Sequence, residues 1–311
     1  MILLCFVDGV GVGERDPARN PLARTPTLLS HFLDGSHSRP LPPEARFRAI
    51  DANLGLPGRP QSATGQASLL TGQNAGAFMG SHVTGFPGPK LRAFVEQHGL
   101  LARLSRRGRS VAFLNAYHTQ YLNAVGFPQP PPRRPEPPLT IPRLYRHPSV
   151  TTVATHAAGI LFRTFDDVLE GRAVFHDVTL AGPRGRGFDL PAVEPIAAGR
   201  ILAAEREHLD LGLFEFFLTD KAGHDQDFEA AEDALLRLEG LLQGALEGLD
   251  LSRDTLVVTS DHGNLEDLSV RTHTRNPIPL LAVGARAGAF LAVSALPEVA
   301  GVVERSILDT L

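Results

Sequence analysis

Apolar residues gather in five short stretches that show little alternation with polar residues. These stretches are Ile2–Val7, Ser110–Asn115, Gly212–Leu218, Thr255–Thr259 and Ile278–Val283. A strand that is covered on both faces reads as a nearly continuous apolar run, whereas a half-exposed strand alternates. We therefore predict that these stretches form buried strands.

Helical periodicity appears between the predicted strands. Apolar side chains recur three and four positions apart in Leu91–Arg106 and again in Phe228–Leu249, where charged residues occupy the opposite side. Strands that alternate with helices favour a mostly parallel sheet covered by helices. The expected fold class is therefore α/β, with a doubly wound, mostly parallel sheet flanked by helices.

One segment interrupts this alternation. Nine of the 22 residues in Phe127–Pro148 are prolines, and proline removes a backbone donor and fixes φ, so this segment is neither a central strand nor a long helix. We predict a proline-rich lid or cap insertion over residues 117–190. The core would then be discontinuous and would consist of residues 1–116 and 191–311.

Composition limits the possible partners. The chain has 311 residues, a net charge of −4 and a single cysteine, Cys5. A charge this small argues against nucleic acid or an anionic membrane as the main partner, and one cysteine excludes an internal disulfide framework. The apolar start is too short for a signal peptide and no apolar run is long enough to span a bilayer, so we expect a cytoplasmic protein.

Acidic residues follow three of the predicted strands, and histidines lie close to them. Ligands gather beyond the carboxyl ends of strands in a doubly wound sheet, so these side chains are expected to converge. The residues are Asp8, Asp220, His224, Asp261, His262 and His273. Mixed carboxylate and imidazole ligands suit zinc, manganese or iron, and six such groups exceed the needs of one tetrahedral ion. Taken singly, Asp8 is equally consistent with a helix cap, and His224 and His273 with ordinary surface histidines.

A candidate nucleophile lies in the small-residue run that starts at Ser62. Turn residues precede Ser62, and the run that follows has the character of a helix start. Backbone N–H groups and the positive end of the helix dipole at such a position stabilise an alkoxide and bind a phosphoryl group. Thr64 is the second candidate, and a purely structural N-cap role for Ser62 is the alternative.

These motifs resemble the alkaline phosphatase superfamily, and within it the cofactor-independent phosphoglycerate mutase and phosphopentomutase branch. The matching pieces are Asp8-Gly9, Thr25-Pro26-x-Leu28, Ser62-x-x-Gly65, Asp220-x-x-Gly223-His224, Ser260-Asp261-His262-Gly263 and His273. The resemblance implies an alkaline phosphatase-like core. It also implies one metal site formed by Asp220, His224 and His273, and another formed by Asp8, Asp261, His262 and the Ser62 oxygen.

The same resemblance implies a metal-dependent enzyme that uses two divalent ions, Mn or Zn, and forms a phosphoserine at Ser62. We expect a phosphomonoester hydrolase acting on a small phosphorylated substrate, because the predicted insertion is too small for the large substrate-retaining domain of the phosphoglycerate mutases. A phosphomutase, a phosphodiesterase or phosphonate hydrolase, and a non-catalytic metal-binding protein are the alternatives. Lys221, Asn264 and Arg275 are candidate substrate-binding residues. The sequence does not predict the oligomeric state.

Overall fold

A six-stranded sheet forms the centre of the molecule. The computed structural model describes residues 1–309, and its main sheet has the strand order β2-β8-β7-β1-β6-β3. The strands are β1 (Ile2–Val7), β2 (Ala45–Ile50), β3 (Val111–Phe113), β6 (Leu211–Phe216), β7 (Thr255–Thr259) and β8 (Ile278–Gly284). Strands β7, β1, β6 and β3 run parallel, while β8 and β2 are antiparallel to their neighbours. The predicted α/β class with a mostly parallel sheet is confirmed.

Strand β2 was not predicted, and its sequence explains why. It lies at the edge of the sheet and reads Ala-Arg-Phe-Arg-Ala-Ile, with only its first and last residues buried. Charged side chains are usual on edge strands, where they discourage pairing with other chains. A search for continuous apolar runs therefore passes over it.

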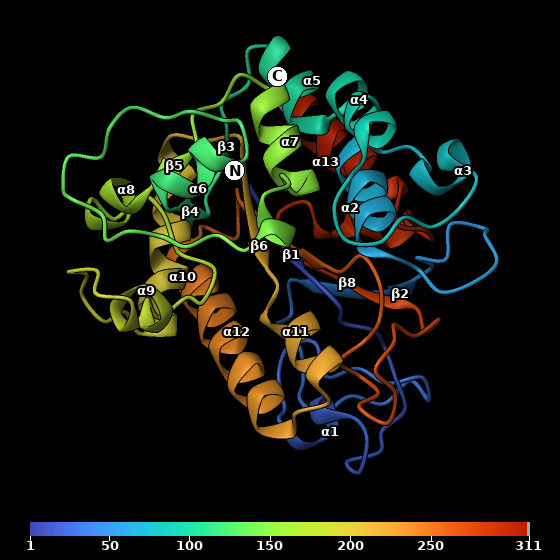
Figure 1. The fold of residues 1–311 in the computed structure, drawn as a ribbon. Coiled ribbons are helices and arrows are strands. Elements are labelled where there is room, and N and C mark those ends of the chain that lie inside the picture. The colour runs from blue at the N-terminus through green and yellow to red at the C-terminus, as the bar shows by residue number, and fades with distance from the viewer. Residues whose placement is uncertain (310–311) are drawn as a thin grey trace.

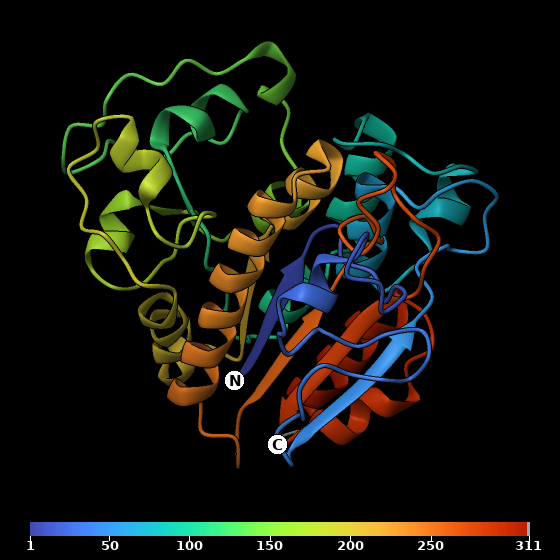
Figure 2. The same ribbon diagram turned by 90° about the horizontal axis from the view of Figure 1, so that it is seen from below.

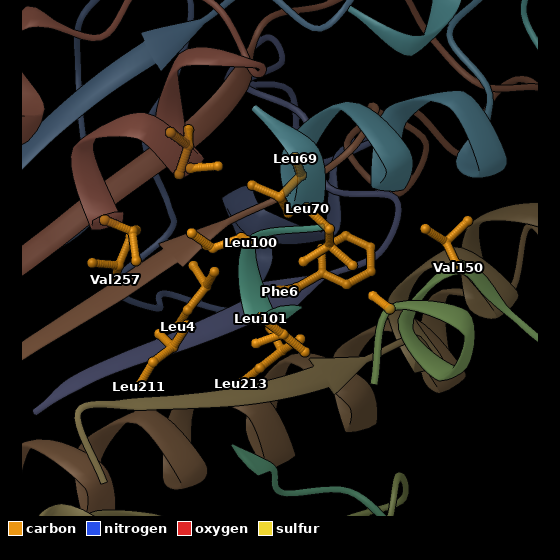
Figure 3. Close-up of a cluster of buried hydrophobic side chains, with 14 of the residues drawn as sticks. Leu4, Phe6, Leu69, Leu70, Leu100, Leu101, Val150, Leu211, Leu213 and Val257 are labelled. Carbon is orange, nitrogen blue, oxygen red and sulfur yellow. The ribbon is translucent and has the colours of Figure 1, made fainter. Parts of the chain in front are cut away.

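One face of the sheet packs against a layer of helices. These helices are α2 (Ser62–Thr71), α4 (Pro89–His98), α5 (Leu100–Arg106), α7 (Val150–Ala157) and α13 (Glu298–Leu308). Figure 3 shows Phe6 of β1 next to Leu70 of α2, and both side chains are buried. The predicted helix Leu91–Arg106 is divided in two because Gly99 leaves the helical conformation, with φ −55° and ψ 131°.

The other face packs against α10 (Pro195–Ala204) and α12 (Phe228–Gly248), which lie side by side in Figures 1 and 2. Helix α12 matches the predicted Phe228–Leu249 to within one residue. It buries its apolar stripe, including Leu235, Leu238 and Leu242, against residues of β1 such as Leu3 and Cys5. The sheet is thus covered by helices on both faces.

Residues 117–190 form a set of short elements, which Figure 1 shows grouped beside α10 and the upper part of α12. The elements are the two-stranded sheet β4 (Ala116–Tyr117) and β5 (Arg163–Thr164), the helices α6 (Thr119–Ala124), α8 (Phe165–Leu169) and α9 (Ala181–Gly185), and the 3-10 turn η1 (Arg143–Tyr145). Ala116 of β4 and Phe165 and Val168 of α8 belong to a small apolar cluster. Val150 and Val153 of α7 belong to the core on one face of the main sheet, as does Leu122 of α6.

The remaining elements are short, except α11, which carries part of the site. They are α1 (Pro21–Arg24), α3 (Ala75–Met79), η2 (Glu205–Glu207), α11 (Leu218–Asp225) and η3 (Ala287–Ala292). Across residues 1–309, none of the helices combines the length and the apolar character that crossing a bilayer requires.

Candidate metal centre

Three aspartates meet at the carboxyl ends of three adjacent parallel strands. Asp8 directly follows β1, Asp261 follows β7 in a turn, and Asp220 lies in the first turn of α11, which begins just after β6. Because β7, β1 and β6 are neighbours in the sheet, the three carboxylates reach the same edge. Parallel strands place ligand-binding groups at this edge as a general rule.

Asp8, Asp261 and His262 form one cluster of candidate ligands. One ligand atom from each of them lies within 4.8 Å of the others, and all three residues are buried. The Nε2 atom of His262 lies 3.3 Å from Asp8 Oδ1 and 3.5 Å from Asp261 Oδ2. Ser62 Oγ lies 3.0 Å from the same Nε2 atom. The structure therefore brings together the four residues predicted for this site.

Asp220, His224 and His273 form a second cluster beside the first. His224 Nε2 lies 3.4 Å from Asp220 Oδ2 and 3.1 Å from His273 Nε2, which is 3.6 Å from Asp220 Oδ1. The ring of His273 stacks on that of His262 with centroids 3.6 Å apart, so the two clusters adjoin. Asp220, His262 and His273 also qualify as a possible ligand group.

Backbone carbonyls set the orientation of the histidine rings. His273 Nδ1 donates to the carbonyl of Pro60 at 2.8 Å, and His224 Nδ1 donates to that of Arg271 at 2.8 Å. Protonation at Nδ1 leaves a lone pair at Nε2, which is the usual arrangement of a metal-binding histidine. The two Nε2 atoms face each other at 3.1 Å. Without a cation, the hydrogen bond to Asp220 raises the pKa of His224 to about 9, and a cation bound at Nε2 would take the place of that proton.

These residues fit divalent cations. Among the described residues, Asp8 Oδ1 is buried without a hydrogen-bond partner, although a buried carboxylate oxygen normally has one. Ligand atoms around a tetrahedral ion with bonds of about 2.0–2.1 Å are about 3.3 Å apart, which is close to the separations above. Carboxylate and imidazole donors together are compatible with both Mn and Zn.

Without a cation, the carboxylates of Asp8, Asp261 and Asp220 repel one another. Burial raises the pKa of Asp8 well above its usual range, and the neighbouring Asp261 and Asp220 raise it further. Burial and Asp220 likewise raise the pKa of Asp261. The pKa of Asp220 falls to about 2, because hydrogen bonding to His224 and the charge of His262 outweigh its burial. Bound cations favour the charged form of all three carboxylates and reverse the shifts of Asp8 and Asp261.

Two motif glycines allow this close approach. Gly9 has φ +71°, and a Cβ there would lie 2.6 Å from Asp220 Oδ1. A Cβ at Gly65 would lie 2.8 Å from the backbone oxygen of Asp261. Helix α2 therefore rests directly on the turn that carries Asp261, and this contact brings Ser62 to His262.

Sequence reasoning did not identify two polar residues that support the centre. Gln66 donates through Nε2 to Asp8 Oδ2 at 3.2 Å and to Asp261 Oδ2 at 3.4 Å. Its position four residues after Ser62, on the same face of a helix, was the signal that could have revealed it. Glu266 is buried and accepts hydrogen bonds from the amides of Gly11 and Asn264 at 2.8 Å each. No spacing rule marks such a residue.

The other predicted site residues lie in different surroundings. Thr64 Oγ1 donates to the carbonyl of Gln61 at 3.1 Å and accepts from the amide of Val83 at 3.3 Å. Asn264 Nδ2 donates to Asp220 Oδ1 at 2.7 Å, so it orients that carboxylate. Lys221 pairs with Asp225 at 2.7 Å, with 69% of its side chain exposed, at the cavity beside the clusters. Arg275 contacts Asn53 instead.

Similarity to a known family agrees with this chemistry. The family model described as the Metalloenzyme superfamily matches residues 168–304. The 2,3-bisphosphoglycerate-independent phosphoglycerate mutase of Dinoroseobacter shibae is 31% identical over 128 residues, which is 38% of this chain and 25% of the mutase. The enzyme of the same name from Desulforudis audaxviator is 32% identical over 140 residues, covering 42% of this chain and 27% of that protein. The matched region is thus about a quarter of each mutase.

Solved structures share the whole fold at low sequence identity. The alkaline phosphatase of the Antarctic bacterium TAB5 superposes with a TM-score of 0.56 at 11% identity, covering 99% of this chain and 97% of that one. The PH0037 protein of Pyrococcus horikoshii gives a TM-score of 0.53 at 14% identity, with coverages of 91% and 84%. Residues 168–304 therefore resemble a family of metalloenzymes, the chain has the fold of an alkaline phosphatase, and its sequence is similar to part of the cofactor-independent phosphoglycerate mutases.

Proposed function

We propose that this protein is a two-metal phosphomonoester hydrolase that acts through a phosphoserine at Ser62. The observation that carries the proposal is the position of the Ser62 hydroxyl. It lies in the first turn of α2 and 3.0 Å from His262 Nε2, a candidate ligand atom of the first cluster. His262 in turn stacks on His273 of the second cluster. A nucleophile at the junction of two cation sites is the arrangement that phosphoryl transfer requires.

Asp8, Asp261, His262 and Ser62 would hold one divalent ion, and Asp220, His224 and His273 the other. Two such ions lower the pKa of the serine hydroxyl and neutralise charge on the phosphoryl oxygens. The first amides of α2 lack acceptors within the helix and can donate to the same oxygens. Ser62 is a better candidate than Thr64, because both hydrogen bonds of the Thr64 hydroxyl are made to the backbone.

The reaction has two balanced steps. Ser62 Oγ attacks phosphorus, the bond from phosphorus to the ester oxygen breaks, and the alcohol departs with a proton while Ser62 retains the phosphoryl group. Water then attacks phosphorus, the bond to Ser62 Oγ breaks, and inorganic phosphate leaves as Ser62 recovers its proton. If a second alcohol replaces water, the same intermediate gives a phosphomutase. This is the second candidate, because the matching relatives are phosphoglycerate mutases.

A variant pair tests the proposal. Ser62→Ala should abolish release of inorganic phosphate from 4-nitrophenyl phosphate while the protein keeps most of its bound metal. Thr64→Val, which removes a neighbouring hydroxyl from the same helix, should retain activity. Brief incubation of the wild type with substrate, followed by acid quenching and peptide mass spectrometry, should place one phosphoryl group on Ser62. Activity in Ser62→Ala equal to that of the wild type would refute the serine mechanism.

Two controls complete the experiment. A chelator should abolish turnover, and added Mn²⁺ or Zn²⁺ should restore it. Adding an acceptor alcohol distinguishes the two candidates, because a hydrolase releases inorganic phosphate in either case, whereas a mutase transfers the phosphoryl group to the acceptor.

A further inference from the structure

A cavity of about 740 Å³ opens beside the two clusters, between the core and residues 117–190. Asp8, Ser62 and Asp220 lie on its wall, as do side chains from the segment 117–190. A phosphoryl group held at Ser62 would therefore direct its ester oxygen and alcohol into this space. The volume is in the range that holds a ligand of drug-like size, well above the needs of a three-carbon acid.

Aromatic rings cover much of the cavity wall and contact one another. Tyr117 stacks on Tyr121 with ring centroids 5.5 Å apart, and it meets His176 edge-on at 4.8 Å. Phe165 lies 5.4 Å from Phe175 and 4.7 Å from Phe188. Rings that support each other in this way lose little freedom on binding and favour flat apolar groups. A small, highly hydroxylated alcohol would leave these rings without a partner.

A single carboxylate lies among these rings. Glu215 belongs to β6, lines the cavity and is only 7% exposed. Its Oε2 accepts a hydrogen bond from Thr151 at 2.6 Å, and in the described part of the chain no cation pairs with it. Burial raises the pKa of this carboxyl to about 7. A buried carboxylate without a cationic partner is costly, and a donor on a bound ligand would offset that cost.

We propose that this cavity selects phosphate esters of alcohols that have a flat aromatic body and a hydrogen-bond donor, a hydroxyl or amino group, that reaches Glu215. The inference rests on the proposed function, since Ser62 must hold the phosphoryl group for the alcohol to enter the cavity. The aromatic wall supplies the apolar contact and Glu215 supplies the polar one. Glycerol phosphates and phosphoglycerates have hydroxyl donors but no aromatic body, so they would not use the aromatic wall.

Binding of non-hydrolysable phosphonates tests this preference without depending on turnover. The Mn²⁺-loaded protein should bind benzylphosphonate at least about tenfold more tightly than ethylphosphonate in calorimetry, since an apolar group in a matching pocket gains about this much. It should bind 4-(aminomethyl)benzylphosphonate about tenfold more tightly than 4-ethylbenzylphosphonate, which has the same shape but no donor. Equal affinities within the first pair would overturn the role of the rings, and equal affinities within the second would overturn that of Glu215.

Substitutions test which side chain is responsible for each difference in phosphonate affinity. Tyr121→Ala should reduce the preference for benzylphosphonate over ethylphosphonate to about twofold or less, and Phe175→Ala provides a second test from another part of the wall. Phe78→Ala, which removes a ring on α3 outside the cavity, should leave the preference unchanged. Glu215→Leu should abolish the preference for the amino group, and Glu215→Gln, which retains an acceptor, should restore part of it. Preferences that persist in both ring variants would contradict the inference.

Hydrolysis of the matching phosphates separates this inference from the proposed function. Benzyl and ethyl phosphate both release a primary alcohol, so their kcat/KM ratio reports binding more than leaving-group chemistry. Tight benzylphosphonate binding without any phosphate release would refute the hydrolase and leave the cavity assignment standing. Equal kcat/KM for the two esters, with Ser62-dependent release, would refute the cavity assignment alone.

Discussion

Several polar groups at the candidate metal centre have a neighbour that fixes their direction. The Nδ1 atoms of His224 and His273 donate to backbone carbonyls, and Gln66 donates to two of the carboxylates at once. Such supporting contacts hold ligands in place before a cation arrives and raise its affinity. The site is therefore built from the ligands and an outer layer of amides and carbonyls.

Gln66 provides a direct test of that outer layer. In Gln66→Leu, a side chain of similar size replaces the amide, and Asp8 Oδ2 and Asp261 Oδ2 lose their shared donor. Metal affinity should fall about 10- to 100-fold, as measured by titration against a competing chelator. Gln73→Leu, an exposed glutamine beyond the end of the same helix, is the matched control. Unchanged affinity in Gln66→Leu would show that this amide does not support the ligands.

The residues of the centre differ in how far sequence alone could predict their place. Asp8, Asp261 and Asp220 were expected to converge because each follows a buried strand, and the sheet brings the ends of those strands together. Gln66 and Glu266 act through the contacts of their side chains, which depend on how α2 and the loops fold back on the sheet. No spacing along the chain encodes those contacts.

At the scale of elements, the contact between α2 and the Asp261 turn is the critical one. The predicted strands Ile2–Val7 and Thr255–Thr259 agree with β1 and β7 at both ends, because a fully buried strand is continuous in apolar residues. Edge strand β2 has no continuous apolar run, because it carries two arginines. The break in the helix at Gly99 depends on the backbone conformation of a single residue, which the apolar pattern does not show.

Gly65→Ala tests this contact. Alanine normally stabilises a helix interior relative to glycine by about 1 kcal/mol. Here a Cβ would lie 2.8 Å from the Asp261 carbonyl oxygen, so α2 must move away from the turn. We expect a loss of about 1–3 kcal/mol in the free energy of unfolding, measured with denaturant, together with weaker metal binding.

Gly288→Ala controls for the loss of a glycine, because nothing lies within 4 Å of a Cβ at that position and its φ is not positive. The control should be neutral in both measurements. Stabilisation of the protein by Gly65→Ala would mean that α2 does not rest on the turn.

At the scale of the whole molecule, the segment 117–190 supplies part of the wall of the cavity beside the two clusters. Its proline content predicted an irregular course, and residues 127–142 indeed form neither helix nor strand. The aromatic wall was not predicted, because Tyr117, Phe165 and Phe188 are far apart in sequence and meet only after the segment has folded onto the core.

The stability of the folded protein should depend on pH through His176, whose side chain lies in this wall. Burial against the wall lowers its pKa from the ordinary value of 6.5 to about 4. Between those values the unfolded chain binds a proton that the folded chain does not, so stability is complete above about pH 6.5 and declines as the pH falls toward 4. The loss attributable to this group should be on the order of 1–3 kcal/mol.

Thermal unfolding of wild type and His176→Phe at pH 5 and pH 7.5, both in chelator, measures this effect. The wild type should lose more stability between the two pH values than the variant, because phenylalanine takes no proton. His208→Phe, at an exposed histidine, should behave like the wild type. Equal losses in wild type and His176→Phe would refute the assignment.

The proposed function depends on two cations bound by side chains that follow β1, β6 and β7 and by His273. The most direct measurement is an anomalous difference map from crystals of the Mn²⁺- or Zn²⁺-loaded protein, collected on both sides of the metal absorption edge. We predict two peaks, one within bonding distance of Asp220, His224 and His273, and the other within bonding distance of Asp8, Asp261 and His262. A map with no peak, or with peaks beyond reach of these residues, would contradict the account.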